Sequence, residues 1–161
     1  MPYVYKHKLE GPIYERGVAR QLASDTYGKA MRESVAILYR KTVINFPVGA
    51  TSIGRNSIKS STRVEIGRGV RLIGVVESQI NYVLFVETGT RPHTPPIAPL
   101  KLWAKRKYGD ESRAWATRGW IKKHGTRPQR PFARAVKATQ ARIVAKLRSA
   151  FRTYEDTLNR G

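Results

Sequence analysis

The sequence predicts an α+β fold in which a long N-terminal helix, two short basic helices and a long C-terminal helix accompany a small antiparallel β-sheet built on a hairpin. Two observations support this class. Apolar residues recur at helical spacing over residues 13–44 and again after Pro131, and two short segments around Gly67-Arg68-Gly69 have the composition of strands. With 161 residues, of which 40% are hydrophobic, the chain can bury one core. We therefore expect an N-terminal arm at residues 1–11 and a single domain at residues 12–161.

Residues 13–44 form the first predicted helix. Its apolar positions approximate one stripe, but the spacing stutters near Ser24-Asp25 and Gly28 weakens the pattern, so two shorter helices are an alternative. The helix is expected to end at Asn45-Phe46-Pro47, because a residue before proline avoids helical geometry. The stripe consists of Val18, Leu22, Tyr27, Met31, Val35 and Leu38.

A β-hairpin is predicted next, after a loop at residues 47–59 that is rich in Gly, Ser, Thr and Asn. Ser60–Ile66 alternates in polarity, Gly67-Arg68-Gly69 supplies a turn, and Val70–Glu77 is a second, more apolar strand. The apolar stretch Tyr82–Glu87 is too short for its periodicity to distinguish a strand from a helix.

Two short helices are predicted after a proline-rich loop at residues 88–99. Pro99 suits the first position of a helix that continues over Leu100–Tyr108, since its missing N–H is not needed there. Asp110 is the predicted cap of a second helix, which runs to about Lys123 and stops at Gly125. The tryptophans of these helices are predicted core or subunit-interface residues, with base stacking as the alternative: Trp103, Trp115 and Trp120.

A long helix closes the chain and begins near Pro131. Its apolar residues recur mostly three and four positions apart, which is typical of a helix with one buried face. They are Phe132, Val136, Ile143, Leu147, Phe151, Tyr154 and Leu158.

The tetrapeptide Gly-Thr-Arg-Pro occurs twice, at residues 89–92 and, 36 positions later, at residues 125–128. The first copy follows an apolar stretch that ends in Glu87. A carboxylate at such a position is costly unless it is paired or hydrogen-bonded. We expect Glu87 to form a structural lock with Arg91 or Arg127, and we interpret the two turns as paired corners that bracket the two short helices.

The chain has 31 Lys and Arg against 11 Asp and Glu, a formal charge of +20. Such an excess opposes compactness by self-repulsion and indicates a polyanion or an acidic protein as a neighbour. Residues 91–134 hold twelve Lys and Arg and only two acids, which is half of the net charge. Contacts to DNA phosphates, without sequence readout, are predicted. The predicted contacts are Lys101, Lys105, Arg106, Lys107, Lys122, Lys123, Arg127 and Arg130, followed by Arg55, Lys59, Arg68 and Arg71.

The sequence offers little for enzyme chemistry. Metal-dependent nucleases hold cations with clustered carboxylates, whereas the acid pairs Asp110-Glu111 and Glu155-Asp156 are neighbours in sequence near helix ends. His7, His93 and His124 lack metal-ligand spacing, and there is no cysteine. We expect no enzyme activity, no metal and no cofactor. No secretory signal and no apolar run of membrane-spanning length are visible, so no membrane partner is expected.

An ordered series of segments resembles the neck or tail-completion (head–tail joining) proteins of long-tailed siphophages, also known as minor tail or minor capsid proteins. The series is Tyr82–Pro92, Pro99–Gly109, a helical stretch around Ala114–Lys123, and Gly125–Ala135 followed by a terminal helix. A long helix, a Pro-Val loop and a hairpin precede it in the same order, so that the resemblance covers roughly residues 15–155. Many relatives have an Asp-Thr-Gly-type loop after the Pro-Val, where this chain has Gly49-Ala50-Thr51-Ser52-Ile53-Gly54.

The resemblance implies a non-enzymatic virion protein at the head–tail junction, which forms a homo-oligomeric ring, expected to be a hexamer, around the path of duplex DNA. Its implied partners are portal, adaptor or head-closure proteins and tail terminator or tail tube proteins, and assembly takes place in the host cytoplasm. Because subunits of charge +20 repel one another within a screening length of about 8–10 Å, the ring should need DNA or acidic neighbours. Residues 1–11 and 88–99 are the predicted docking segments. The alternative is a stand-alone basic protein that binds nucleic acid without sequence specificity.

Overall fold

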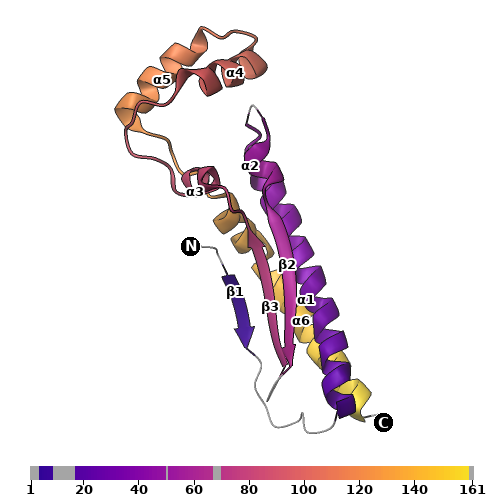
Figure 1. Ribbon diagram of the computed structural model, residues 1–161. Coiled ribbons are helices and arrows are strands. Elements are labelled where there is room, and N and C mark those ends of the chain that lie inside the picture. Colours follow the sequence, from indigo (N-terminus) through magenta and orange to yellow (C-terminus); the bar gives the residue numbers. More distant parts are fainter. Residues whose placement is uncertain (1–3, 9–16, 50, 67–69, 160–161) are drawn as a thin grey trace.

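The computed structural model describes residues 4–8, 17–49, 51–66 and 70–159, and these form six helices and three strands (Figure 1). In chain order the elements are β1 (Val4–Lys8), α1 (Gly17–Asn45), α2 (Ile53–Asn56), β2 (Lys59–Ile66), β3 (Val70–Glu77), α3 (Asn81–Thr88), α4 (Ile97–Tyr108), α5 (Arg113–His124) and α6 (Pro131–Asn159). The predicted α+β class is confirmed. None of the described helices is both long and apolar enough to cross a membrane.

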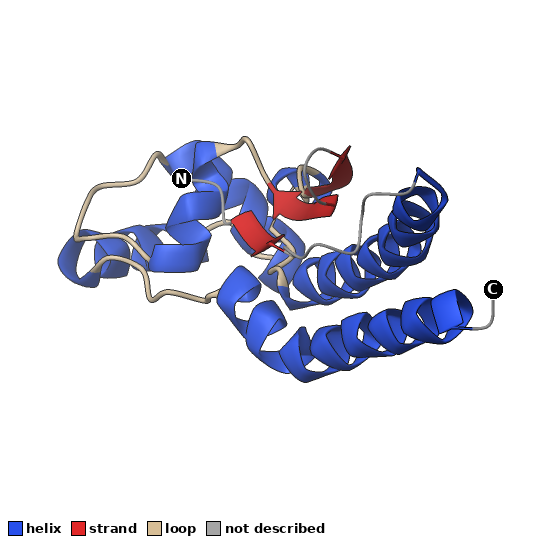
Figure 2. Cartoon of the chain, turned by 90° about the horizontal axis from the view of Figure 1, so that it is seen from below, coloured by secondary structure: helices blue, strands red, loops and turns tan. Residues whose placement is uncertain are grey.

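The two long helices, α1 and α6, lie side by side and run in opposite directions (Figures 1 and 2). Each has 29 residues, which at 1.5 Å per residue corresponds to about 43 Å. Tyr27 of α1 is buried in their contact, with its ring centroid 5.4 Å from that of Tyr154 and 6.4 Å from that of Phe151. Tyr154 and Phe151 of the predicted apolar face therefore pack on α1, while the side chain of Leu158 lies outside the described residues.

α1 is one continuous helix, so the alternative of two shorter helices is wrong. Ala23, Tyr27, Gly28 and Met31 are all buried. A glycine inside a helix costs about 1 kcal/mol relative to alanine. The apolar area buried along this face is large enough to offset that cost and to keep the helix intact through the stutter in its sequence.

The sheet is antiparallel, with strand order β1-β3-β2. β2 and β3 form the predicted hairpin, whose turn at residues 67–69 lies outside the described residues. Residues 1–11 were predicted to be an arm apart from the domain. Val4–Lys8 instead pairs with β3, with Val4 opposite Val75 and Lys8 opposite Arg71. The second edge of β3 would otherwise present unpaired N–H and C=O groups, and β1 satisfies them.

One face of β3 packs closely on α1. Leu72 and Val76 are buried there, and Gly74 lies between them. A Cβ at Gly74 would overlap a methyl group of Val35 and lie 2.9 Å from the sulfur of Met31, so the close contact needs glycine. The core continues from this contact toward α3 and the start of α6 through Phe46, Ile58, Val83, Val86 and Phe132.

A charged pair links α1 to α6 at the surface, where Lys146 Nζ donates a hydrogen bond to Glu33 Oε2. This contact holds the pKa of Glu33 below its ordinary value of 4.5. Because the folded-state pKa is lowered, the stability that Glu33 contributes is present above its unfolded pKa and is lost as the pH falls through the folded pKa.

In the unmodified chain the free energy of unfolding should fall as the pH drops below 4.5, and we expect Lys146→Met to make this fall smaller. Urea denaturation at a series of pH values measures the difference. The change should be small, because solvent screens partly exposed pairs. Lys137→Met removes an exposed lysine from the same helix and should leave the pH dependence as it is. Equal profiles for Lys146→Met and the unmodified chain would contradict the assignment.

Candidate functional site: two matched turns and a basic helical hairpin

The two Gly-Thr-Arg-Pro turns lie against each other. The N–H of Thr90 donates to the carbonyl oxygen of Thr126, and the N–H of Thr126 donates to that of Thr90, each at 3.1 Å. The two side-chain hydroxyls lie 2.9 Å apart. The result is an antiparallel bridge of one residue on each side. The prediction of paired corners is confirmed, and residues 89–92 together with 125–128 are termed the turn clasp.

Both glycines of the turn clasp end a helix and face the opposite turn. Gly89 and Gly125 have φ values of 76° and 71°, and their N–H groups donate to Phe85 and Ile121, both at 2.8 Å. A Cβ at Gly89 would lie 2.5 Å from the carbonyl oxygen of Thr126, and one at Gly125 would overlap that of Thr90. The repeated sequence thus has a structural cause, because the same type of helix end occurs on both sides of the bridge.

Glu87 fixes the adjoining junction between α3 and α6. It is only 6% exposed, and its Oε2 and Oε1 accept hydrogen bonds from the N–H groups of Phe132 at 2.9 Å and Ala133 at 3.0 Å. These are free donors at the start of α6, where the helix dipole also favours a negative charge. The ambiguous stretch that precedes the turn is helical, with Val83, Val86 and Glu87 buried three and four positions apart.

The predicted partners of Glu87 are wrong. Arg91 and Arg127 are exposed, and neither of these two described residues forms an ion pair with Glu87. The guanidinium groups keep their hydration, while backbone donors offset the burial of the carboxylate. Pro131 carries a signal for this arrangement, because a proline at the first helical position leaves the next two N–H groups as the first available donors.

Between the two turns, α4 and α5 form a helical hairpin that projects from the rest of the molecule (Figure 1). Residues 97–124 are termed the basic hairpin, because they hold eight Lys and Arg and only two acids. The last turn of α4 holds Lys105, Arg106 and Lys107, and that of α5 holds Lys122 and Lys123. Cations at these ends interact favourably with the helix dipoles.

The ends of the two short helices differ in detail from the prediction. α4 begins at Ile97, so Pro99 is its third residue, still within the first turn where a missing N–H is tolerated. Asp110 is not the cap residue of α5, which begins at Arg113. Its carboxylate instead accepts hydrogen bonds from the N–H and the hydroxyl of Ser112, at 2.8 and 2.7 Å, and these lower the pKa of Asp110. Gly125 ends α5 as predicted.

Aromatic rings hold several cations of the basic hairpin in position. Lys107 Nζ lies 5.1 Å from the ring centroid of Trp103, and the guanidinium of Arg113 lies 4.9 Å from that of Tyr108. Lys101 and Arg118 lie 5.9 and 5.6 Å from the ring centroid of Trp115. Such pairs occur about once per 70–80 residues in proteins. Their concentration here restrains long side chains, so less conformational entropy is lost when these cations meet an anion.

Two of the three tryptophans are more exposed than a core role allows, whereas Trp103 is half-buried. Trp115 is 54% and Trp120 46% exposed, so the core prediction is wrong for both. The buried residues of α4 and α5 are small, Ala104 and Ala114, and the large rings therefore lie outside the contact between the two helices. A role at a subunit interface stays a prediction.

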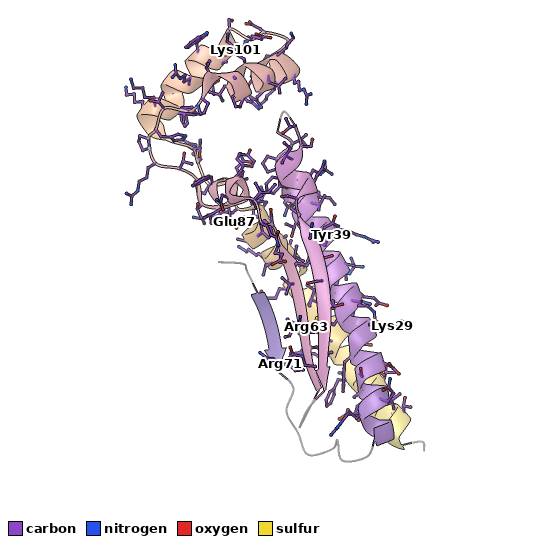
Figure 3. All side chains as sticks on the ribbon, viewed as in Figure 1. Lys29, Tyr39, Arg63, Arg71, Glu87 and Lys101 are labelled. Carbon is purple, nitrogen blue, oxygen red and sulfur yellow. The ribbon has the colours of Figure 1, made fainter. Side chains whose placement is uncertain are left out.

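The structure gathers most of the predicted DNA contacts at one end of the molecule. Lys101 of the basic hairpin and Arg71 of β3 lie at opposite ends (Figure 3), and Arg71 also pairs with Glu65 at 3.5 Å. The residues grouped in the basic hairpin are Lys101, Lys105, Arg106, Lys107, Lys122 and Lys123, with Arg127 and Arg130 exposed after it.

The three remaining predicted DNA contacts are Arg55, Lys59 and Arg68. Arg55 belongs to α2, which faces the basic hairpin across a groove, and Lys59 begins β2 just after it. Arg68 lies outside the described residues. Arg113 and Arg118 were not predicted, although their position beside the aromatic residues of the same two helices was a usable signal.

The described residues contain no group of three or more His, Asp or Glu side chains that could hold a metal ion. His93 and His124 make local contacts instead, with their Nδ1 atoms 2.9 Å from the carbonyl oxygen of Arg91 and 3.1 Å from that of Trp120.

Comparison with known proteins gives no match, whether to protein-family models, to curated proteins or to solved structures. Function must therefore be argued from the residues and their geometry.

Proposed function

We propose that the chain is a structural, non-enzymatic virion protein of a tailed phage, which forms a homo-oligomeric ring, a hexamer, at the head–tail junction and surrounds the path of duplex DNA. Its neighbours in the virion are portal, adaptor or head-closure proteins on one side and tail terminator or tail tube proteins on the other. The observation that supports this proposal most is the basic hairpin, which carries eight cations on a projection anchored by the turn clasp. The order of sequence segments supports the phage assignment.

The dimensions of the basic hairpin suit the DNA backbone. Its two helices have 12 residues each, so each is about 18 Å long. Duplex DNA carries one charge per about 1.7 Å of its axis when both strands are counted. A stretch of duplex as long as one of these helices therefore carries about ten phosphates. Contacts to phosphates carry no sequence information, which suits a channel through which any sequence must slide.

Because the subunits repel one another, we expect ring assembly to depend on a negatively charged partner. Every subunit carries a formal charge of +20, and the fields of close neighbours overlap within a screening length of about 8–10 Å. The isolated protein should therefore associate only weakly at low salt, and duplex DNA or an acidic partner should promote the ring. A stable ring in dilute low-salt buffer without any partner would contradict this view.

Removing charge from the basic hairpin should weaken DNA binding selectively. We expect a variant with glutamine at Arg106, Lys107, Lys122 and Lys123 to bind duplex DNA at least about ten-fold more weakly. The slope of log K against log salt should also decrease by about 0.9 for each phosphate that is no longer neutralised. Fluorescence anisotropy between about 50 and 200 mM salt measures both quantities. The control has glutamine at Lys137, Arg142, Arg148 and Arg152, which are exposed on α6. Equal losses for the two variants would show that only net charge matters.

Imaging of the intact particle tests the proposal as a whole. Cryo-electron microscopy of the virion should show a ring at the head–tail junction that contains the long α1–α6 pair, with the basic hairpins turned toward the DNA. A virion without the chain at that junction would overturn the proposal. If the free protein also bound duplex DNA with sub-micromolar affinity, the stand-alone nucleic-acid-binding function would be favoured, and metal-dependent cleavage of DNA would indicate a nuclease.

A further inference from the structure

An open groove of about 640 Å³ separates the basic hairpin from the rest of the molecule. One wall comprises the loop after α1, with α2 and α3, and the other comprises α4 and α5 with the proline-bearing loop between α3 and α4. The volume is in the range of protein sites that bind an organic ligand or a few side chains of a partner. The groove is termed the hairpin groove.

The hairpin groove has unusually exposed apolar walls. Ile53 of α2, Tyr82 and Phe85 of α3, and Leu102 of α4 line it, and they are 57%, 50%, 51% and 39% exposed. The wall is fixed near α2, because Gly54 leaves room for the rings of Phe46 and Tyr82, where a Cβ would lie 2.9 and 3.0 Å from their nearest carbons. Apolar side chains gathered in this way are typical of an interaction site.

Arg127 is the charged residue among the described residues that line the hairpin groove, and the charges of the neighbouring segments have the same sign. The segments that line it, residues 46–54, 80–86, 90–103 and 117–129, contain no Asp or Glu. The same segments hold Arg91, Lys101, Arg118, Lys122, Lys123 and Arg127. An occupant must therefore offer apolar side chains to the walls and carboxylates to the surrounding cations.

We propose that the hairpin groove docks an acidic amphipathic segment of a partner protein, with large apolar side chains between Ile53, Phe85 and Leu102 and carboxylates toward Arg127 and the neighbouring cations. A helix with one apolar and one acidic face matches this pattern, as in other recognition of helices by grooves. The apolar walls of this site are separate from the proposed DNA contacts, whereas four of its cations belong to both: Lys101, Lys122, Lys123 and Arg127. If the ring proposed above forms, the hairpin groove is where a neighbouring virion protein attaches to it.

Charge decides against a second copy of the chain as the occupant. Two chains of charge +20 repel, and the chain has only 11 acids. Of its two acid pairs, Asp110-Glu111 is already bonded to Ser112 and Lys105, and Glu155-Asp156 follows Tyr154, which is 2% exposed and packs on Tyr27. The apolar residue beside these acids is therefore already engaged within its own subunit.

A peptide-binding experiment tests the proposal on the full chain. The probe is a fluorescein-labelled synthetic helical peptide with Leu and Phe on one face and Glu on the other, and anisotropy measures its affinity. One control peptide has Gln in place of Glu, and a second has the acidic composition in scrambled order. We expect the acidic amphipathic peptide to bind at least about ten-fold more tightly than either control, since both the apolar face and the charge contribute.

Two exposed residues of α3 provide a matched pair of variants. Phe85 and Leu84 are both 51% exposed, but only Phe85 lines the hairpin groove. Phe85→Glu should lower the affinity for the acidic peptide at least about ten-fold. Leu84→Glu should change this affinity less than about two-fold. Ile53→Glu, on another element of the same wall, should repeat the loss. Circular dichroism melting curves check whether all three variants fold.

Three results would overturn the proposal. Equal effects of Phe85→Glu and Leu84→Glu would remove the hairpin groove from the binding site. A greater loss of duplex DNA affinity for Phe85→Glu than for Leu84→Glu would make the hairpin groove part of the DNA interface. Self-association of the unmodified chain that Phe85→Glu abolishes, measured by sedimentation velocity, would identify a second copy as the occupant. A variant with glutamine at Arg106 and Lys107 alone, which lie outside the segments that line the hairpin groove, should lose DNA affinity and keep peptide binding, and this separates the two sites.

Discussion

Alanine in place of Gly125 is expected to lower the free energy of unfolding by about 3–4 kcal/mol, which is near the upper limit for single substitutions. Two effects combine. A positive φ costs an L-residue about 1–2 kcal/mol, and the new Cβ would overlap the carbonyl oxygen of Thr90 and lie 2.8 Å from the carbonyl carbon of Arg91. Both neighbours are backbone atoms, so the turn clasp itself must open. Urea denaturation followed by circular dichroism measures the loss.

Two other glycines separate these effects. Gly109 has a φ of 74°, and a Cβ there would have no neighbour within 4 Å, so Gly109→Ala should cost only about 1–2 kcal/mol. Gly119 lies inside α5 with the same open space, and Gly119→Ala should stabilise the chain by up to about 1 kcal/mol. If Gly125→Ala were no more harmful than Gly109→Ala, the close approach of the two turns would not be a source of stability.

Glu87→Ala is the second substitution for which we expect a large effect, a loss of about 3 kcal/mol in the free energy of unfolding. It removes the acceptor of two N–H groups at the start of α6, and a hydrogen bond to a charged group contributes about 1.5–3 kcal/mol. Glu87→Gln keeps the shape and one carbonyl acceptor but loses the charge at the helix N-terminus, so about 1–2 kcal/mol should be lost.

Thermal and urea denaturation of both Glu87 variants, with Glu155→Ala as a control, would measure this series. Glu155 is exposed near the end of α6, and its removal should change stability by less than about 0.5 kcal/mol. A graded loss from Gln to Ala supports a carboxylate that caps the helix. A loss for Ala with none for Gln would assign the effect to packing instead of charge.

The fold could be predicted where a local pattern has one physical cause. The apolar spacing after Pro131 reflects the burial of one helix face, and Gly125 ends a helix because it tolerates a positive φ. The pairing of the two turns is suggested by their identical sequences, which end a helix in the same way in both copies. For the helix face and the helix end the signal lies within a few residues of the structure that it predicts, whereas for the two turns it is a repeat 36 residues apart.

The sequence did not reveal contacts that depend on where distant elements meet. Glu87 lies 45 residues before Phe132, and no pattern near Glu87 indicates that the start of α6 reaches it. The strand Val4–Lys8 lies far along the chain from its partner β3. The exposure of Trp115 follows from the close contact of α4 and α5 through small residues, and a tryptophan count cannot indicate on which side of a helix pair a ring lies.

The turn clasp also has a topological consequence. Thr90 and Thr126 are hydrogen-bonded to each other, so the chain leaves the body and returns to it at nearly the same point. The 35 residues between them thus have the geometry of an insertion. If this segment is removed or replaced, the two ends of the body's chain still lie next to each other. The entropy of closing such a loop grows only with the logarithm of its length. We therefore expect the body to tolerate hairpins of different length and charge at this position, so that the part for which we propose DNA contacts can change while the α1–α6 pair and its sheet stay the same.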